Sequence, residues 1–74
     1  MAPAAPTVSI VVPFFNEAEG VALLRERLDQ ALAECPEVVF EIVCVDDGST
    51  DDTLARLVAL ASRDPRFLVI ELSR

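Results

Sequence analysis

Short apolar runs and longer amphipathic segments alternate along the chain. Runs rich in Val, Ile, Leu and Phe at residues 8–12, 40–45 and 67–72 predict β-strands, because β-branched and aromatic side chains favour a pleated backbone. Pro13 follows the first run, and we expect it to end that strand because proline has no backbone N–H. Residues 1–7 contain proline and show no periodic pattern, so they are expected to form a flexible leader.

The segments between these runs have the spacing of amphipathic helices. The first extends from Glu17 to about Glu34, with Asn16 as its expected N-cap and Pro36 beyond its end. The second follows Ser49, its expected N-cap, and is closed by residues 63–65. Apolar residues three or four positions apart form one face of each helix: Val21, Leu24, Leu28, Ala31 and Leu32 in the first, and Leu54, Leu57, Val58 and Ala61 in the second.

The predicted order is strand, helix, strand, helix, strand, which indicates an α/β fold with a parallel sheet. Successive right-handed crossovers in one direction put both helices on the same face of that sheet. The apolar strands suit a sheet covered on both faces, and this chain offers nothing for the second face. Residues 8–74 are therefore expected to be the first half of a larger doubly wound domain.

Composition narrows the function classes. The basic residues are all arginine and number six against thirteen Asp and Glu, and the net charge of −7 argues against nucleic acid or an anionic membrane as the direct partner. Hydrophobic residues make up 53% of the chain, which excludes a disordered acidic tail. No apolar run approaches the roughly 18 residues of a spanning helix, and no secretory signal is visible. Cys35 and Cys44 have no metal-site spacing, and we interpret them as reduced thiols of a cytoplasmic chain.

Polar residues that can carry chemistry follow the first two strands, at the edge where open parallel sheets bind ligands. Asp46 and Asp47 precede Gly48, so they are compatible with a simple turn that favours the next helix. They are equally compatible with a carboxylate that accepts hydrogen bonds from a nucleobase or a sugar hydroxyl. The sequence alone leaves both interpretations open.

The segment from Pro13 to Glu17 also has two interpretations. Glu17 can stabilise the start of a helix or contact a ribose, and Phe15 can be a core aromatic or can stack on a base. Pro13 can end a strand or keep the backbone close to a ligand. There is no glycine-rich dinucleotide motif, no P-loop and no nucleophile beside a base, so no catalytic residue is proposed. If the first two strands are neighbours, this segment and the Asp46–Asp47 segment face one crevice, and Arg74 is expected to be the only cation near it.

Three segments together resemble a known family: VSIVVPFFNE, FEIVCVDDGSTDDTL and FLVIELSR. They are similar to the N-terminus of glycosyltransferase family 2, nearest to polyprenol-phosphate sugar transferases of the dolichol-phosphate mannosyltransferase type. The resemblance implies half of a Rossmann-like, glycosyltransferase A-type fold, with a GDP- or UDP-hexose as donor and a polyprenyl phosphate as acceptor. The residues that match the family's nucleotide contacts are Pro13, Phe15, Glu17, Val45 and Asp47, with Asn16 and Asp46 in supporting roles.

The resemblance also implies what these residues lack. The family's metal-binding D-x-D motif, acceptor site and catalytic base lie downstream of Arg74, so the Mg²⁺ or Mn²⁺ expected for the full-length protein has no ligands here. We therefore expect the chain alone to be inactive and the full-length protein to work at the cytoplasmic face of the membrane. Phe15 stands where the family often has Tyr, which keeps the ring and removes a hydroxyl hydrogen bond of about 1 kcal/mol.

Two other interpretations remain. A receiver-type signalling module is also doubly wound with an Asp pair at a strand end, although its pair follows the first strand and its phosphorylated Asp the third. Here the pair follows the second predicted strand, and the third ends in residues 71–74, which contain no Asp. An inert gene fragment is the remaining possibility, and it is compatible with the family resemblance.

Overall fold

The computed structural model describes residues 7–72 and has the α/β order predicted from the sequence. Its strands are β1 (Thr7–Phe14), β2 (Val39–Asp46) and β3 (Phe67–Glu71), and its helices are α1 (Ala18–Glu34) and α2 (Thr53–Arg63). All strand pairs are parallel, in the order β1-β2-β3. Thr7 already belongs to β1, and the rest of the expected leader, with Ser73 and Arg74, lies outside the described residues.

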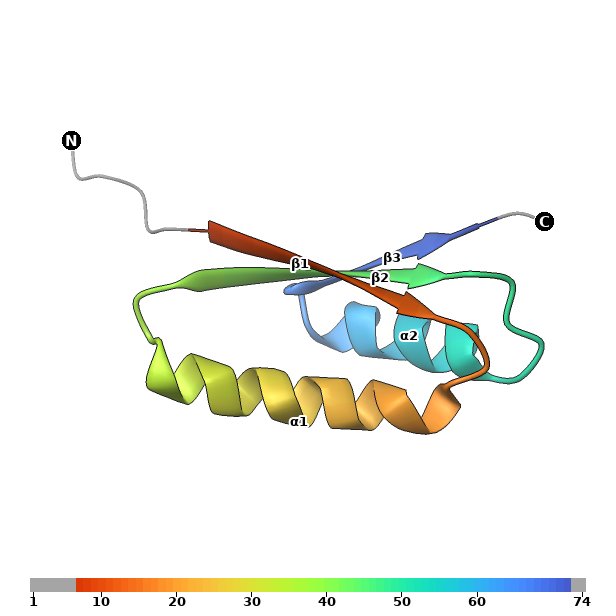
Figure 1. Ribbon diagram of the computed structural model, residues 1–74, viewed down its shortest axis with the longest axis horizontal. Helices are drawn as coiled ribbons and strands as arrows, with labels where there is room; N and C mark the ends of the chain where they lie inside the picture. The colour runs from red at the N-terminus through yellow and green to blue at the C-terminus, as the bar shows by residue number, and fades with distance from the viewer. Residues whose placement is uncertain (1–6, 73–74) are drawn as a thin grey trace.

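Both helices lie on one face of the sheet, as two right-handed crossovers require (Figure 1). The core between the layers takes side chains from every element: Phe14, Val21, Leu28, Ile42, Cys44, Leu57 and Phe67. Burial raises the pKa of the Cys44 thiol, because a thiolate loses solvation in an apolar core. Cys44 is therefore a packing residue of the core.

The strand order distinguishes the two doubly wound topologies considered above. The central strand of the described sheet is β2, which pairs with β1 on one side and β3 on the other. In the receiver-type order the first strand lies between the second and third, whereas the nucleotide-binding order places the second strand between the first and third. The observed sheet has the nucleotide-binding order, so the receiver-type interpretation is wrong.

Pro13 does not end β1, which continues to Phe14 and pairs Pro13 with Val45. The carbonyl of Phe14 accepts a hydrogen bond from the Asp47 N–H at 2.9 Å, so the polar backbone groups of Phe14 face β2. The backbone groups of the preceding residue point the other way, toward the outer edge of β1. A proline nitrogen there removes no ladder hydrogen bond, so an edge strand tolerates it.

The helix caps also differ from those predicted. The N-cap of α1 is Glu17 rather than Asn16, and the N-cap of α2 is Asp52 rather than Ser49. Neither cap makes a side-chain hydrogen bond to its helix. Asn16 has a left-handed backbone, with φ of 49°, and its side chain faces a different loop.

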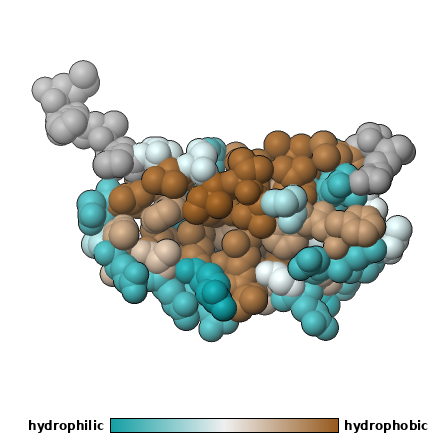
Figure 2. All heavy atoms as spheres, viewed as in Figure 1, coloured by the Kyte–Doolittle hydropathy of each residue, from teal (hydrophilic) through white to brown (hydrophobic). Residues whose placement is uncertain are grey.

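The face of the sheet opposite the helices is apolar. Register and alternation place two rows of side chains there: Val11, Val43 and Leu68 in one, and Pro13, Val45 and Ile70 in the other. We call these six residues the open sheet face. No element among residues 7–72 covers it (Figure 1), and hydrophobic residues gather over the sheet layer in Figure 2. The exposed fractions of Val11, Leu68 and Ile70 are 64%, 47% and 48%.

Candidate functional site

Two loops meet at the carboxyl edge of the sheet. The first loop, residues 15–17, joins β1 to α1, and the second loop, residues 47–52, joins β2 to α2. They lie side by side because β1 and β2 are paired in parallel, from Thr7 with Val39 to Phe14 with Asp46. The Asp47–Phe14 backbone hydrogen bond extends this pairing into the second loop. The sequence therefore correctly predicted that the two polar segments lie at the same edge of the sheet.

Side chains bind the two loops to each other. The Asn16 N–H donates to Ser49 Oγ at 3.0 Å, while Asn16 Oδ1 accepts from the Thr50 N–H at 2.8 Å. The Asp51 N–H also approaches this oxygen, at 3.3 Å. The Glu17 N–H donates to Thr53 Oγ1 at 3.0 Å. These bonds span more than 30 residues of sequence, so each loop helps to fix the backbone of the other.

Asp46 is almost fully buried, with 2% of its surface exposed. Its Oδ1 accepts from the Ser49 hydroxyl at 2.5 Å, and its Oδ2 lies 3.3 Å from the Ser49 nitrogen, which donates to it. A buried carboxylate needs such donors to offset its loss of hydration. Asp46 therefore shapes the second loop.

The end of the second loop is held to the start of α2 by Asp51 and Thr53. Thr53 is fully buried, and both its hydroxyl and its backbone N–H donate to Asp51 Oδ1. The Thr53 hydroxyl bond is the main reason that the pKa of Asp51 lies below its usual range, because hydrogen bonds to the charged form favour that form. Both ends of the second loop are thus anchored by polar side chains.

The structure places the predicted binding residues around this edge. Pro13 and Val45 are register partners on the open sheet face, and Asp47 is half-buried at the start of the second loop. Phe15 and Glu17 are exposed, and they line a hollow of about 480 Å³ together with residues of both loops. The lining includes the carboxylates of Glu17, Glu19, Asp51 and Asp52. Such a surface suits ligand groups that donate hydrogen bonds, such as hydroxyls and ring N–H groups.

Arg56 is the residue of this region that the sequence did not predict. It lines the same hollow, where its Nη1 donates to the Ala18 carbonyl at 3.3 Å and its Nε donates to Asp52 at 3.1 Å. The sequence predicted Arg74 as the only cation near the crevice, and Arg56 shows that this was wrong. Because α2 begins at Thr53, residue 56 lies in its first turn, at the carboxyl edge. The missed signal was the Asp52–Arg56 spacing of four residues, typical of a helical ion pair.

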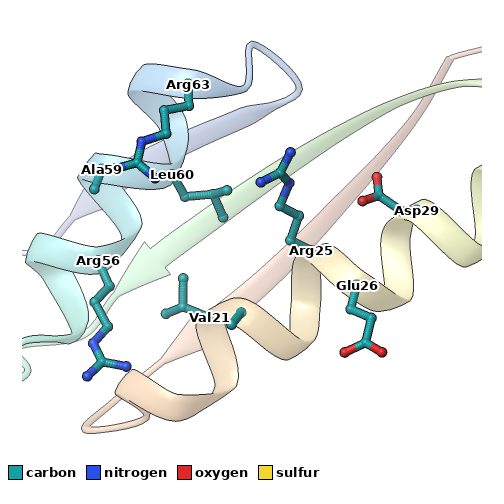
Figure 3. Close-up of a pocket in the computed structure, with 9 residues that line it drawn as sticks. Val21, Arg25, Glu26, Asp29, Arg56, Ala59, Leu60 and Arg63 are labelled. Atoms are coloured by element: carbon teal, nitrogen blue, oxygen red, sulfur yellow. The ribbon is translucent and has the colours of Figure 1, made fainter.

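A second groove, of about 500 Å³, lies between α1 and α2 on the outer side of the helix layer (Figure 3). Its floor is apolar, and Val21 and Leu60 are among the residues that form it. Its charged residues have both signs: Arg25, Arg56, Arg63, Glu26 and Asp29. The groove contains none of the residues predicted to bind a nucleotide.

Residues 7–72 include no group of three or more His, Cys, Asp or Glu arranged to hold a metal ion. Neither of the described helices is long and apolar enough to cross a membrane.

Comparison with known proteins identifies the family. The model of the family described as "Glycosyl transferase family 2" matches residues 9–74, which include both loops. The chain belongs to glycosyl transferase family 2. This confirms the resemblance found in the three sequence segments, and the parallel sheet agrees with half of that family's Rossmann-like fold.

Several curated members of glycosyl transferase family 2 are similar to this chain. A glycosyltransferase of Synechocystis is 36% identical over 67 residues, which are 90% of this chain and 21% of that protein. The dodecaprenyl-phosphate galacturonate synthase of Rhizobium johnstonii is 41% identical over 68 residues, 90% of this chain and 20% of the synthase. An undecaprenyl-phosphate 4-deoxy-4-formamido-L-arabinose transferase of Photorhabdus laumondii is 36% identical over 64 residues, 84% of this chain and 19% of that transferase. The chain thus spans about 20% of the length of these relatives.

Proposed function

We propose that the two loops form part of the donor site of a glycosyltransferase that moves a hexose from a nucleotide sugar to a polyprenyl phosphate. The family match and the lipid-phosphate sugar transferases among the relatives support this proposal. The observation that carries it is the pairing of β1 with β2, which brings Phe15, Glu17 and Asp47 to one edge of the sheet. Residues 8–74 are then the N-terminal half of the nucleotide-binding domain.

Each predicted residue has a role that its surroundings permit. Asp47 is half-buried, so its carboxylate can accept hydrogen bonds from a base more strongly than a fully hydrated group can. Phe15 is 53% exposed, which leaves ring surface for stacking on a flat base. Glu17 lies in the acidic hollow, where ribose hydroxyls find acceptors. Pro13 and Val45, which are paired at the ends of β1 and β2, supply apolar contacts for the nucleotide beside these residues.

The rest of the reaction is assigned to residues outside the described range. The proposed donor is a GDP- or UDP-hexose, and the divalent ion expected for the family, Mg²⁺ or Mn²⁺, would be held with the acceptor by residues beyond 74. We propose that the full-length protein works at the cytoplasmic face of a membrane. The net charge of −7 gives no support for a nucleic-acid partner.

The test is Asp47→Asn in the protein expressed from its complete reading frame. The substitution removes a charge from a group proposed to accept hydrogen bonds from the base. Because a hydrogen bond to a charged group contributes about 1.5–3 kcal/mol, affinity for the nucleotide sugar should fall about ten- to a hundred-fold. Calorimetric titration with UDP-glucose and, separately, with GDP-mannose measures this change.

Asp29→Asn is the matched control, because Asp29 is exposed on α1 and this substitution makes the same chemical change away from both loops. Its donor affinity should equal that of the wild type. Equal affinities of the Asp47 variant and the wild type would return Asp47 to the role of a turn residue. A wild-type protein that binds neither nucleotide sugar would contradict the proposed function.

A further inference from the structure

We propose that Asn16 is a positioning residue, whose side-chain carbonyl oxygen holds the two donor-binding loops in register. The inference rests on the proposed function, since it concerns how that donor site is kept in shape. Asn16 lies between Phe15 and Glu17 in the first loop, and its bonds reach the loop that carries Asp47. It therefore connects the residues expected to contact the nucleotide without needing to touch it.

The bonds of Asn16 form a continuous path between the loops. Its Oδ1 accepts from the Thr50 N–H at 2.8 Å, and the Asp51 N–H lies within 3.3 Å of the same oxygen. Its own N–H donates to Ser49 Oγ, which in turn donates to the buried carboxylate of Asp46. Since Asp46 ends β2 and precedes Asp47, the path runs from the first loop to the base-contacting end of the central strand.

The chemistry of the position explains why it holds an asparagine. Its φ of 49° lies in the left-handed region, which Asn, Asp and Gly occupy more readily than other residues. Its main partners are backbone N–H groups, so they must face the amide oxygen and not the amide nitrogen. Glycine would keep the backbone and remove the acceptor, whereas aspartate would keep both. These two substitutions therefore separate the acceptor from the backbone.

These bonds from Asn16 to the second loop, which we call the clamp, have a consequence for binding. Phe15 and Glu17 lie on an exposed loop, and ordering such a loop when a ligand binds reduces affinity. A loop that is already held in its binding geometry avoids that loss. Removal of the acceptor is thus expected to weaken donor binding although no ligand contact is removed.

The experiment compares Asn16→Gly and Asn16→Asp with the wild type, all expressed from the complete reading frame. Calorimetric titration with UDP-glucose and with GDP-mannose should show about tenfold weaker binding for Asn16→Gly, as expected when preorganisation is lost. Asn16→Asp should recover binding to within about threefold, measured at about 0.5 M NaCl so that its added charge is screened. Ser62→Ala is the control, since it removes a side-chain bond to the Ala59 carbonyl on an exposed part of α2.

Kinetics separate positioning from general destabilisation. If Asn16 positions the donor loops, Asn16→Gly raises KM for the donor and leaves KM for the acceptor unchanged. A merely structural role would lower the amount of active protein and leave the donor KM of the folded fraction as it was. Should Asn16→Gly fail to fold, Ser49→Ala removes the other arm of the path and should weaken donor binding in the same direction.

The possible outcomes are distinct. A wild-type protein that binds neither nucleotide sugar overturns the proposed function and this inference with it. Wild-type binding with an equally tight Asn16→Gly, or with an equally tight Ser49→Ala where the glycine variant does not fold, overturns the clamp alone. Equal weakening in Asn16→Gly and Asn16→Asp also overturns it, because the amide nitrogen of Asn16 would then be the group that matters.

Discussion

The open sheet face should make residues 1–74 associate when they are expressed alone. Full burial of a Val, Leu or Ile side chain stabilises a fold by about 1.5–3 kcal/mol. Val11, Leu68 and Ile70 keep 64%, 47% and 48% of their surface exposed, so about half of that stabilisation is missing at each. Together they forgo about 2–5 kcal/mol, a sizeable part of the ~5–15 kcal/mol that stabilises a whole domain.

The perturbation replaces one row of the open sheet face with threonine: Val11→Thr, Val43→Thr and Leu68→Thr together. Threonine keeps a high strand propensity, and its hydroxyl stays hydrated on an exposed face. The matched control is Val69→Thr, because Val69 follows Leu68 on β3 and packs against the core from the helix side. A hydroxyl buried there without a partner costs about 1–3 kcal/mol, so this variant should lose stability.

The assays are equilibrium ultracentrifugation over a range of concentrations and binding of a hydrophobic dye. Wild-type residues 1–74 should self-associate or bind the dye, and the threonine row should reduce both signals. In the protein expressed from the complete reading frame, the same three threonine substitutions should lower the melting temperature if other residues cover this face. A wild-type chain that is monomeric at high concentration, silent to the dye and cooperative in melting would refute the reasoning.

Two further predictions concern activity and acid stability. Residues 1–74 should transfer no sugar from UDP-glucose or GDP-mannose, with or without Mg²⁺ or Mn²⁺, because a diphosphate leaving group needs an ion or a cationic clamp and the family's metal-binding motif is expected beyond Arg74. Radiolabelled product above background would contradict this. A hydrogen bond from the Arg66 side chain is the main cause that lowers the pKa of Asp64 in the folded protein. The ionised carboxylate therefore gives its full stabilisation above the unfolded pKa of about 3.9, and this stabilisation is lost as the pH falls through the lower folded pKa. Asp64→Asn should therefore lower the free energy of unfolding by about 1.5–3 kcal/mol near neutral pH and weaken its dependence on pH below about 4. The exposed control Asp29→Asn should have smaller effects on both quantities. Urea unfolding over a pH series measures the free energy and its pH dependence.

Local sequence was sufficient for the elements and their arrangement. The strands and helices lie within a few residues of the predicted bounds, because apolar spacing and β-branched runs act over short distances. The crossover rule then predicted that both helices share one face. The continuation of β1 through Pro13 was not predictable in this way, since it depends on β1 being at an edge of the described sheet. The sheet order had to be known first.

The candidate site was predicted less completely. The strand-end segments were identified because parallel strands bring their carboxyl ends to one edge. The partners of Asn16 and Ser49 were missed, because these side chains bond across 33 residues and not to the helix that follows each of them. Arg56 was missed for a related reason: the predicted start of α2 was too early, so residue 56 was not placed in its first turn. Local rules describe neighbours in sequence, whereas the bonds between Asn16 and the second loop join residues that only the fold makes neighbours.

The two failed cap predictions have one physical cause. A side-chain cap stabilises a helix by about 1 kcal/mol, and Asn16 and Ser49 are residue types that supply it. Both instead bind the opposite loop, and α1 and α2 begin without a side-chain cap bond. Both helices thus give up the preferred side-chain cap at the same edge of the sheet. This is expected where function requires a fixed arrangement of the two loops more than each helix requires its cap. The positions that contradict the sequence rules thus lie beside the residues proposed to bind the nucleotide sugar.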